Sequence, residues 1–190
     1  MFLRSACLSL SILTGTLCQA AEVPPAMADY ITGDLKNWVN APRIVAAVQE
    51  QNARHAGLTA ADINAMDTVW RGQVGVADAP DIAPVLNNPL SDFLREHVAL
   101  AGGRITEAFV MDNRGLNVAT SGVTSDYWQG DEAKFQKTFG AGAGAVFVDD
   151  IELDESTQTY QGQVSFSITD PTSGEVIGAV TIGLDASAFY

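Results

Sequence analysis

The chain has 190 residues and carries 23 acidic side chains against 10 basic ones, which gives a formal net charge of −13 at pH 7. Nucleic acid and anionic lipid head groups normally bind to a basic patch, so this balance argues against both as partners. The length suits one domain with a substantial core, and nothing beyond the first twenty residues approaches about 18 consecutive apolar residues. We therefore expect no direct membrane insertion.

Residues 1–20 have the features of a secretory signal peptide. Arg4 is the only charged residue in this stretch, the apolar run ACLSLSILTGTLC follows it, and small residues end it. The pattern predicts cleavage after Ala20 and a periplasmic or secreted mature protein of residues 21–190.

Both cysteines of the chain, Cys7 and Cys18, fall within this predicted signal. The mature protein would therefore have no disulfide, no thiolate metal site and no cysteine nucleophile. Attachment of a lipid to Cys18 is the alternative, but the residue before a lipidated cysteine is normally small and Leu17 is not.

The first part of the mature chain has helical periodicity. Apolar residues recur at three- and four-residue steps from Pro24 to about Gly57, which predicts a long helix. Asn40 and Pro42 predict a restart or kink within it, because proline lacks the amide donor and suits a first turn.

Two further helices are predicted after this one. Thr59 can cap the first of them, with Asp62 three residues on. The segment GVADAPDIAPVLNNP (75–89) has three prolines and no period, so we expect a loop there. The last of these helices is predicted to begin at Asn88 and to end at Gly102.

After Gly103 the apolar period changes from 3.6 to 2, which indicates strands. The predicted strands cover residues 104–112, 116–121, 145–153, 159–170 and 175–185. A short helix is expected from Asp131 to Phe139. This order predicts an α+β fold, in which a long N-terminal helix and a helical insert pack on a five-stranded antiparallel sheet. Apolar and polar residues alternate in 163–169, so one sheet face would be dry and the other wetter.

The segment TSDYWQGDEAKF (124–135) combines aromatic and charged residues within twelve positions. We expect it to lie across the apolar inner face of the sheet and to form the wall of a small-molecule pocket. Tyr127 and Trp128 would supply apolar surface, and Lys134 would meet a ligand carboxylate. Gln129 or the Tyr127 hydroxyl would orient the ligand. The alternative is that the aromatic side chains only cover the sheet while Lys134 stays in water.

Other chemistry has weaker support. The mature chain has no G-x-S-x-G motif and only two histidines, His55 and His97, so nucleophilic hydrolysis is not predicted. The run GAGAGA (140–145) suggests a phosphate loop, but a helix precedes it and a strand follows it, which is the reverse of such loops. We predict no catalytic residues, no cofactor and no metal site.

Two acidic groupings remain as alternatives. Asp150, Glu152 and Asp154 share one side of a predicted strand and could hold calcium, although no D-x-D-x-D-G loop accompanies them. A carboxylate pair for glycoside hydrolysis could be drawn from the acidic residues of 126–132, but spacing in sequence does not give the separation that this mechanism needs.

The order of these elements resembles the single Cache sensor domains, which are extracytoplasmic relatives of PAS domains. The most specific part of the resemblance is FVMDNRGLNVATS joined to DYWQGDE, and the whole extends from about Pro24 to Phe189. The resemblance implies a PAS/Cache-like five-stranded antiparallel sheet, with the ligand between the sheet and the loops and helix that cross it. It also implies a small metabolite as ligand, such as a carboxylate, an amino acid or an amine.

The sequence departs from the Cache pattern among its candidate ligand residues, which are Tyr127, Trp128, Gln129, Asp131 and Lys134. Many Cache domains have an R-x-R-x-W-Y type stretch after the second strand, whose arginine meets the ligand carboxylate. This chain has no arginine in that region, so the charge of the ligand stays open.

By this resemblance we expect an exported, non-enzymatic sensor module that relays ligand occupancy to a membrane-bound kinase, cyclase or chemoreceptor. Cache domains usually lie between two membrane helices, which this sequence lacks, so the relay would pass through a contact with the partner. We place that contact on the exposed face of the long N-terminal helix, near Asp29, Asp34 and Lys36. The alternatives are a secreted enzyme that uses the acidic residues near 126–132, and a structural or interaction protein that binds no ligand.

Overall fold

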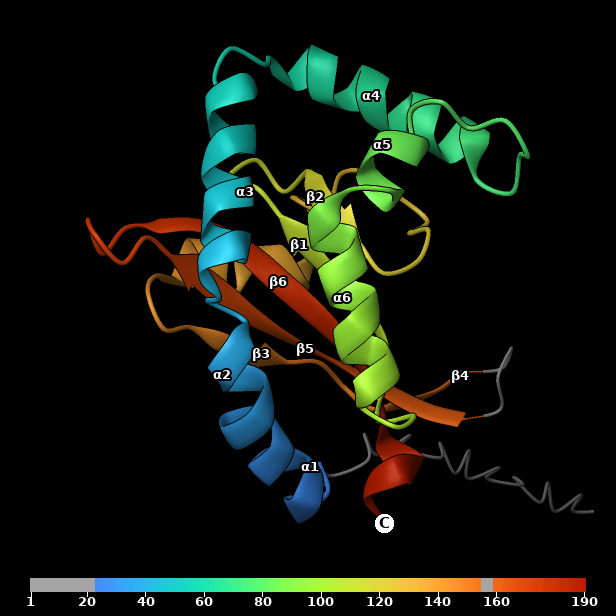
Figure 1. The fold of residues 1–190 in the computed structure, drawn as a ribbon, viewed down its shortest axis with the longest axis vertical. Coiled ribbons are helices and arrows are strands. Elements are labelled where there is room, and N and C mark those ends of the chain that lie inside the picture. The colour runs from blue at the N-terminus through green and yellow to red at the C-terminus, as the bar shows by residue number, and fades with distance from the viewer. Residues whose placement is uncertain (1–22, 155–158) are drawn as a thin grey trace, which may run out of the picture.

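The computed structural model describes residues 23–154 and 159–190. The predicted signal peptide therefore lies outside the described residues. The fold is α+β, as the sequence predicts, and its main helices cover one face of an antiparallel sheet (Figure 1). In Figure 1, α1–α3 and α6 run alongside each other in front of β5 and β6, and α4 crosses their upper end.

The helices are α1 (Pro25–Tyr30), the π-helix η1 (Ile31–Leu35), α2 (Lys36–Trp38), α3 (Pro42–Arg54), α4 (Ala60–Gln73), α5 (Ala83–Leu86), α6 (Pro89–Leu100), α7 (Ala133–Gln136), and the 3-10 turns η2 (Phe139–Ala141) and η3 (Ala186–Phe189). The strands are β1 (Ile105–Met111), β2 (Asn117–Thr120), β3 (Val146–Val148), β4 (Glu152–Asp154), β5 (Thr159–Thr169) and β6 (Val176–Asp185).

The sheet has five positions in the order β2-β1-β6-β5-β3, and all neighbours are antiparallel. β4 pairs with β5 beyond the end of β3, so the predicted strand 145–153 is present but divided in two. At the break, Ile151 turns into the core and packs over Gly162, which has no side chain to obstruct it. The burial of this isoleucine therefore interrupts the regular pairing of the edge.

The long N-terminal helix forms with the predicted restart at Pro42, and it also contains a π turn. Its buried side chains Met27, Ile31, Leu35 and Val39 are spaced at four residues throughout. Four residues exceed one α-helical turn, so a regular helix would rotate this stripe by about 40° at each step. The wider turn of η1 offsets that rotation and keeps the four side chains against the core.

The apolar face of the sheet lies under these helices. Its side chains are Ala108, Val110, Val164, Phe166, Ile168, Val180, Ile182 and Leu184, all of them in one core cluster with the helical stripe. The opposite face is the wetter one, as the alternation in 163–169 predicts, and α7 and η2 pack against it. The expectation that residues 124–135 cross the apolar face is therefore wrong, because the helices already need that face for their own apolar stripes.

The helical insert matches the sequence prediction at its caps. The Thr59 hydroxyl accepts a hydrogen bond from the Asp62 amide, and the Asp62 carboxylate accepts one from the Thr59 amide, which completes a capping box. The predicted loop 75–89 differs, since it contains the short helix α5. Ile82, at the start of α5, is buried against Trp70, so tertiary packing rather than periodicity produces this turn of helix.

The β1–β2 hairpin is fixed to α3 by the buried carboxylate of Asp112. This carboxylate accepts hydrogen bonds from Gln51 Nε2 at 3.0 Å, from the Arg114 amide at 2.8 Å and from the Leu116 amide at 3.0 Å. It also lies 2.8 Å from Nδ1 of His55. The tight turn of the hairpin and the end of α3 are therefore held as one unit.

Glycine is required where this hairpin meets the segment that follows β2. A Cβ on Gly115 would lie 2.6 Å from backbone atoms of Gly130, and its φ of +81° disfavours any side chain. Gly174 has a similar φ of +76°, but a Cβ there would meet nothing. A substitution at Gly174 therefore tests only the cost of the left-handed backbone, whereas one at Gly115 adds the cost of the contact with Gly130.

We predict that Gly174→Ala lowers the free energy of unfolding by about 1–2 kcal/mol, the cost of a left-handed conformation. Gly115→Ala should cost a further 1–3 kcal/mol or so, because the backbone of Gly130 must also move. Chemical denaturation of both variants measures the difference. Equal losses would show that the contact between the hairpin and Gly130 is loose.

Candidate functional site

Polar side chains lie in register across the sheet face that α7 covers. Ser165 on β5 is paired with Thr181 on β6, and their hydroxyl oxygens are 2.8 Å apart. Two residues further along, on the same face, Gln163, Gly183 and Glu107 form a row across β5, β6 and β1. The central strands thus present hydroxyls, an amide and a carboxylate to the segment that covers them.

Glu107 reaches across the central strand because Gly183 has no side chain. A Cβ on Gly183 would lie 2.7 Å from Cγ of Glu107, so the glutamate occupies that space. Its Oε1 accepts a hydrogen bond of 3.0 Å from Gln163 Nε2. Burial raises the pKa of Glu107, while Lys134 and the bond from Gln163 act in the opposite direction.

Lys134, on α7, is oriented toward this face. Its side chain is only 13% exposed, and Nζ lies 2.8 Å from Oε2 of Glu132 and 3.4 Å from Oε1 of Gln129. The same ammonium is 5.4 Å from the centre of the Phe109 ring on β1. Lys134 is therefore an enclosed lysine with neighbours on both the covering segment and the sheet, and it does not stay in water.

Three buried polar atoms on this face have no hydrogen-bond partner among the described residues. They are Oδ1 of Asn117, Oγ1 of Thr120 and Oγ of Ser167. The strand register places all three on the Glu107 side, since Thr120 is paired with Phe109 and both Ser167 and Asn117 lie in the row of Met111. A buried polar group without a hydrogen-bond partner lowers the stability by about 1–3 kcal/mol. A bound molecule that formed hydrogen bonds with these three atoms would remove this cost.

Tyr127 and Trp128 have their contacts elsewhere. The Tyr127 ring is buried and stacks on Trp70 of α4, with ring centres 5.2 Å apart, and burial raises the pKa of its phenol. Trp128 is half-buried, and its Nε1 donates to the Arg114 carbonyl at 2.8 Å. Both amides donate to Oδ1 of Asp67 at 3.0 Å. These two residues attach the covering segment to α4 and to the hairpin.

Of the predicted site residues, the structure therefore brings together Gln129 and Lys134. Gln129 is buried and donates from Nε2 to the Asp126 carbonyl, which leaves Oε1 toward Lys134. Asp131 is exposed at the start of the segment that leads into α7.

Sequence reasoning missed Glu107 and the polar residues of β5 and β6 as site residues. Two signals were present in the sequence. Glu107 is the one charged residue inside the predicted strand 104–112, between its charged end residues Arg104 and Asp112. The polar residues at 163, 165 and 167 alternate with apolar ones.

The acidic residues of 126–132 and the two histidines, which were considered for catalysis, mostly contact other side chains of the protein. Asp126 lies 3.8 Å from Arg71, Glu132 pairs with Lys134, and His55 pairs with Asp112. His97 packs on the Phe93 ring at 4.1 Å. Within residues 23–154 and 159–190, no group of three or more His, Cys, Asp or Glu side chains is arranged to hold a metal ion.

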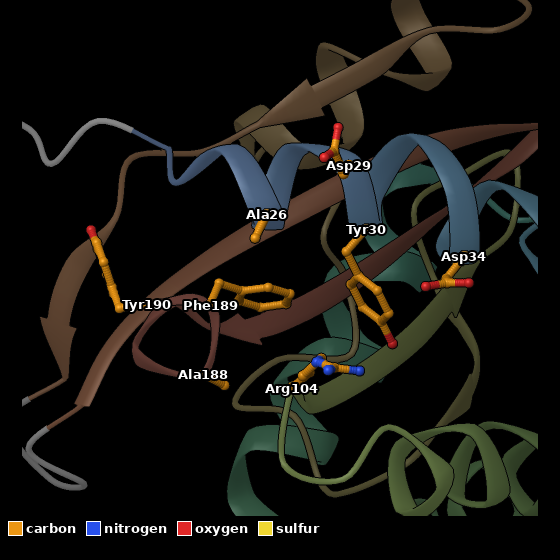
Figure 2. Close-up of a pocket in the computed structure, with 8 residues that line it drawn as sticks. All are labelled: Ala26, Asp29, Tyr30, Asp34, Arg104, Ala188, Phe189 and Tyr190. Carbon is orange, nitrogen blue, oxygen red and sulfur yellow. The ribbon is translucent and has the colours of Figure 1, made fainter.

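A groove of about 480 Å³ lies between α1–η1 and η3 (Figure 2). It is lined by Ala26, Asp29, Tyr30, Asp34, Arg104, Ala188, Phe189 and Tyr190. The Tyr30 and Phe189 rings are 5.4 Å apart, and the Arg104 guanidinium lies 5.7 Å from the Tyr30 ring. Burial raises the pKa of the Tyr30 phenol, Asp34 adds to this rise, and Arg104 opposes it.

Comparisons with known proteins find similarity among solved structures only. No protein-family model matches the chain, and no curated protein matches it. The sensor domain of the V. cholerae histidine kinase DctB is 10% identical, with a TM-score of 0.36 over 85% of this chain and 53% of that one. The Campylobacter jejuni chemoreceptor Tlp3 sensory domain with isoleucine bound is 13% identical, with a TM-score of 0.40 over 88% and 66%.

The ligand-binding domain of the Pseudomonas aeruginosa PAO1 amino acid chemoreceptor PctC, in complex with GABA, is 12% identical, with a TM-score of 0.38 over 85% of this chain and 63% of that one. This chain thus spans between 53% and 66% of the length of these three domains. They are sensor and ligand-binding domains of a kinase and of chemoreceptors. Among the described helices of this chain, none has the length and apolar character needed to cross a bilayer.

We predict that Asp67→Ala lowers the free energy of unfolding by about 2–4 kcal/mol, because the amides of Tyr127 and Trp128 both lose their acceptor. Hydrogen exchange at these two amides should also become faster. Asp126→Ala is the matched control, since it removes only a partly exposed carboxylate beside Arg71 and should cost about 1 kcal/mol or less. Equal effects of the two variants would mean that Asp67 does not hold the covering segment.

Proposed function

We propose that this protein is an exported, non-enzymatic sensor module of Cache type, which binds a small polar metabolite between the sheet and residues 121–145. The observation that carries the proposal is the buried polar face, on which three atoms lack a hydrogen-bond partner among the described residues. In the apo protein these buried polar atoms have lost their contact with water without gaining a hydrogen bond from a described residue. A ligand that formed hydrogen bonds with them would therefore bind without a further desolvation penalty at these atoms. Small-molecule sites commonly combine apolar walls with a few placed polar groups of this kind.

The proposed site uses the predicted residues in two ways. Lys134 and Gln129 border the ligand from the covering segment, and Asp131 lies at its exposed entrance. Tyr127 and Trp128 act indirectly, because their contacts with Asp67 and Trp70 hold the segment in place. The hydroxyls of β5 and β6 form the floor.

The proposed relay requires that the bound and free states differ in affinity for a partner, since a ligand shifts an equilibrium only through such a difference. We place the partner, a membrane-bound kinase, cyclase or chemoreceptor, on the exposed side of α1–α2. Asp29, Asp34 and Lys36 are all exposed there, and the first two line the groove of Figure 2.

One observation favours a second candidate, an interaction protein without a ligand. The Phe135 and Phe139 rings stack 4.9 Å apart and pack over Phe109, Met111 and Ala179, so part of the polar face is filled by the protein itself. The two candidates differ in whether the remaining polar part accepts a small molecule.

We expect a thermal-shift screen of acids, amines, amino acids and sugars to find a stabilising ligand. At 100 times its dissociation constant, the ligand adds about 2.7 kcal/mol, which should raise the Tm by roughly 5–10 °C. Ser167→Ala should reduce this shift and leave the apo protein as stable or more stable, because it removes an unpartnered hydroxyl.

The control for this experiment is Ser187→Ala, an exposed position in η3 that should change neither stability nor binding. A screen without any stabilising compound, together with a stabilised Ser167→Ala variant, would favour the interaction protein.

For the relay, we expect copurification from envelope extracts to recover a membrane signalling protein in amounts that depend on the best ligand of the screen. Asp34→Lys should reduce the recovery, because it reverses a charge on the proposed contact surface. Asp78→Lys reverses an exposed charge in the loop after α4 and should have no effect. Recovery that responds neither to ligand nor to Asp34→Lys would contradict the relay.

A further inference from the structure

The charges around the polar face do not favour a free carboxylate as ligand. Lys134 is the enclosed cation there, and its ammonium already has the Glu132 carboxylate at 2.8 Å and the Gln129 carbonyl at 3.4 Å. Lys137 is exposed and lies over the Phe147 ring at the outer edge of the sheet. An anionic ligand would have to compete with Glu132 for Lys134 and would also meet Glu107.

Lys134 already has two acceptors, whereas the carboxylate of Glu107 has few hydrogen-bond donors. Among the described residues it receives one hydrogen bond, from Gln163 Nε2, whereas an ionised carboxylate can accept about four. Its location is largely buried, which raises its pKa and penalises the ionised form. A cationic donor placed beside Glu107 would therefore reduce the penalty that burial imposes.

The unpartnered atom of Asn117 has the same requirement. Both donors of this amide are used, since Nδ2 donates to Oγ1 of Thr124 at 2.9 Å and to the Asp126 carbonyl at 3.0 Å. The remaining Oδ1 can only accept. The face therefore presents a buried acceptor without a described partner at Asn117 and a half-buried carboxylate with one hydrogen-bond donor at Glu107.

Aromatic rings beside these acceptors also suit a cation. The Phe109 ring, which follows Glu107 by two residues on the same face of β1, already has one ammonium 5.4 Å from its centre. Ring faces attract ammonium groups, and the attraction grows when water is excluded. Carboxylate, amide oxygen and aromatic ring are together the groups that recognise an organic amine.

We infer that the ligand of this site is an organic amine, whose ammonium is received by Glu107 beside the Phe109 ring, rather than a free carboxylate held by Lys134. The inference rests on the proposed function of the same site. It fixes the charge of the ligand, which the sequence leaves open.

The test uses linear diamines of two to six carbons, each with the diacid and the diol of the same chain length, titrated into the exported protein by calorimetry. At least one diamine should bind, and its diacid and diol should bind at least about tenfold more weakly, as expected for a charge-assisted contact. Glu107→Gln should weaken the diamine at least about tenfold, because it keeps the shape and the contact with Gln163 but removes the charge. Lys134→Met should strengthen diamine binding, because it removes the ammonium group that lies beside Phe109 and acts on Glu107.

The pH dependence gives an independent readout. Burial raises the pKa of Glu107, and Lys134 is the charged group that faces it from α7. Lowering the pH should therefore protonate Glu107 before it protonates exposed glutamates, and the diamine should weaken as this happens. A carboxylate ligand would show the reverse, since protonation of Glu107 would remove a repulsive charge. Apo Tm values of both variants at each pH control for folding.

The outcomes separate this inference from the proposed function. Binding of a diacid that Lys134→Met abolishes and Glu107→Gln leaves intact would overturn the amine and keep the sensor. Failure of every diamine to bind would also overturn the amine, while the broader thermal-shift screen decides whether any small molecule binds.

Discussion

The alternation of side chains along β1, β5 and β6 is the constraint on which the other layers depend. Successive residues of a strand point to opposite faces, so the same eleven residues of β5 supply Val164, Phe166 and Ile168 to the helices and Gln163 and Ser165 to the other side. A shift of one residue in pairing would place hydroxyls under the helices and would expose the core. The register that stabilises the protein and the register that builds the candidate site are therefore the same.

Local signals in the sequence predict most of the fold. Pro42, the Thr59 capping box and the glycine turn at Gly115 act within a few residues, so the elements that they begin or end appear where the sequence places them. The short helix α5 is missed because its cause is not local. Ile82 is buried in the same apolar cluster as Trp70, and the sequence around Ile82 gives no sign of this contact.

The candidate site is predicted less well than the fold for the same reason. Tyr127 and Trp128 are a plausible ligand surface until Trp70 and Asp67, about sixty positions earlier in the chain, are known to contact them. Glu107 has the appearance of a surface residue of a strand, because only the glycine at position 183 and the covering segment enclose it. Sequence reasoning identifies residues with suitable chemistry, whereas the pairing of distant segments decides which of them share an environment.

The central strand β6 supplies Val180, Ile182 and Leu184 to the core, but it has a glycine at one close contact on each face of the sheet. Gly183 makes room for Glu107, and Gly178 lets β6 approach the Met111 carbonyl and Val48 closely. The surface that would recognise a ligand comes mainly from β1, β5 and residues 121–145, and β6 contributes Thr181 to it. During evolution, substitutions on the flanking strands and on residues 121–145 would therefore change the ligand specificity while the pairing of β6 with its neighbours stays the same.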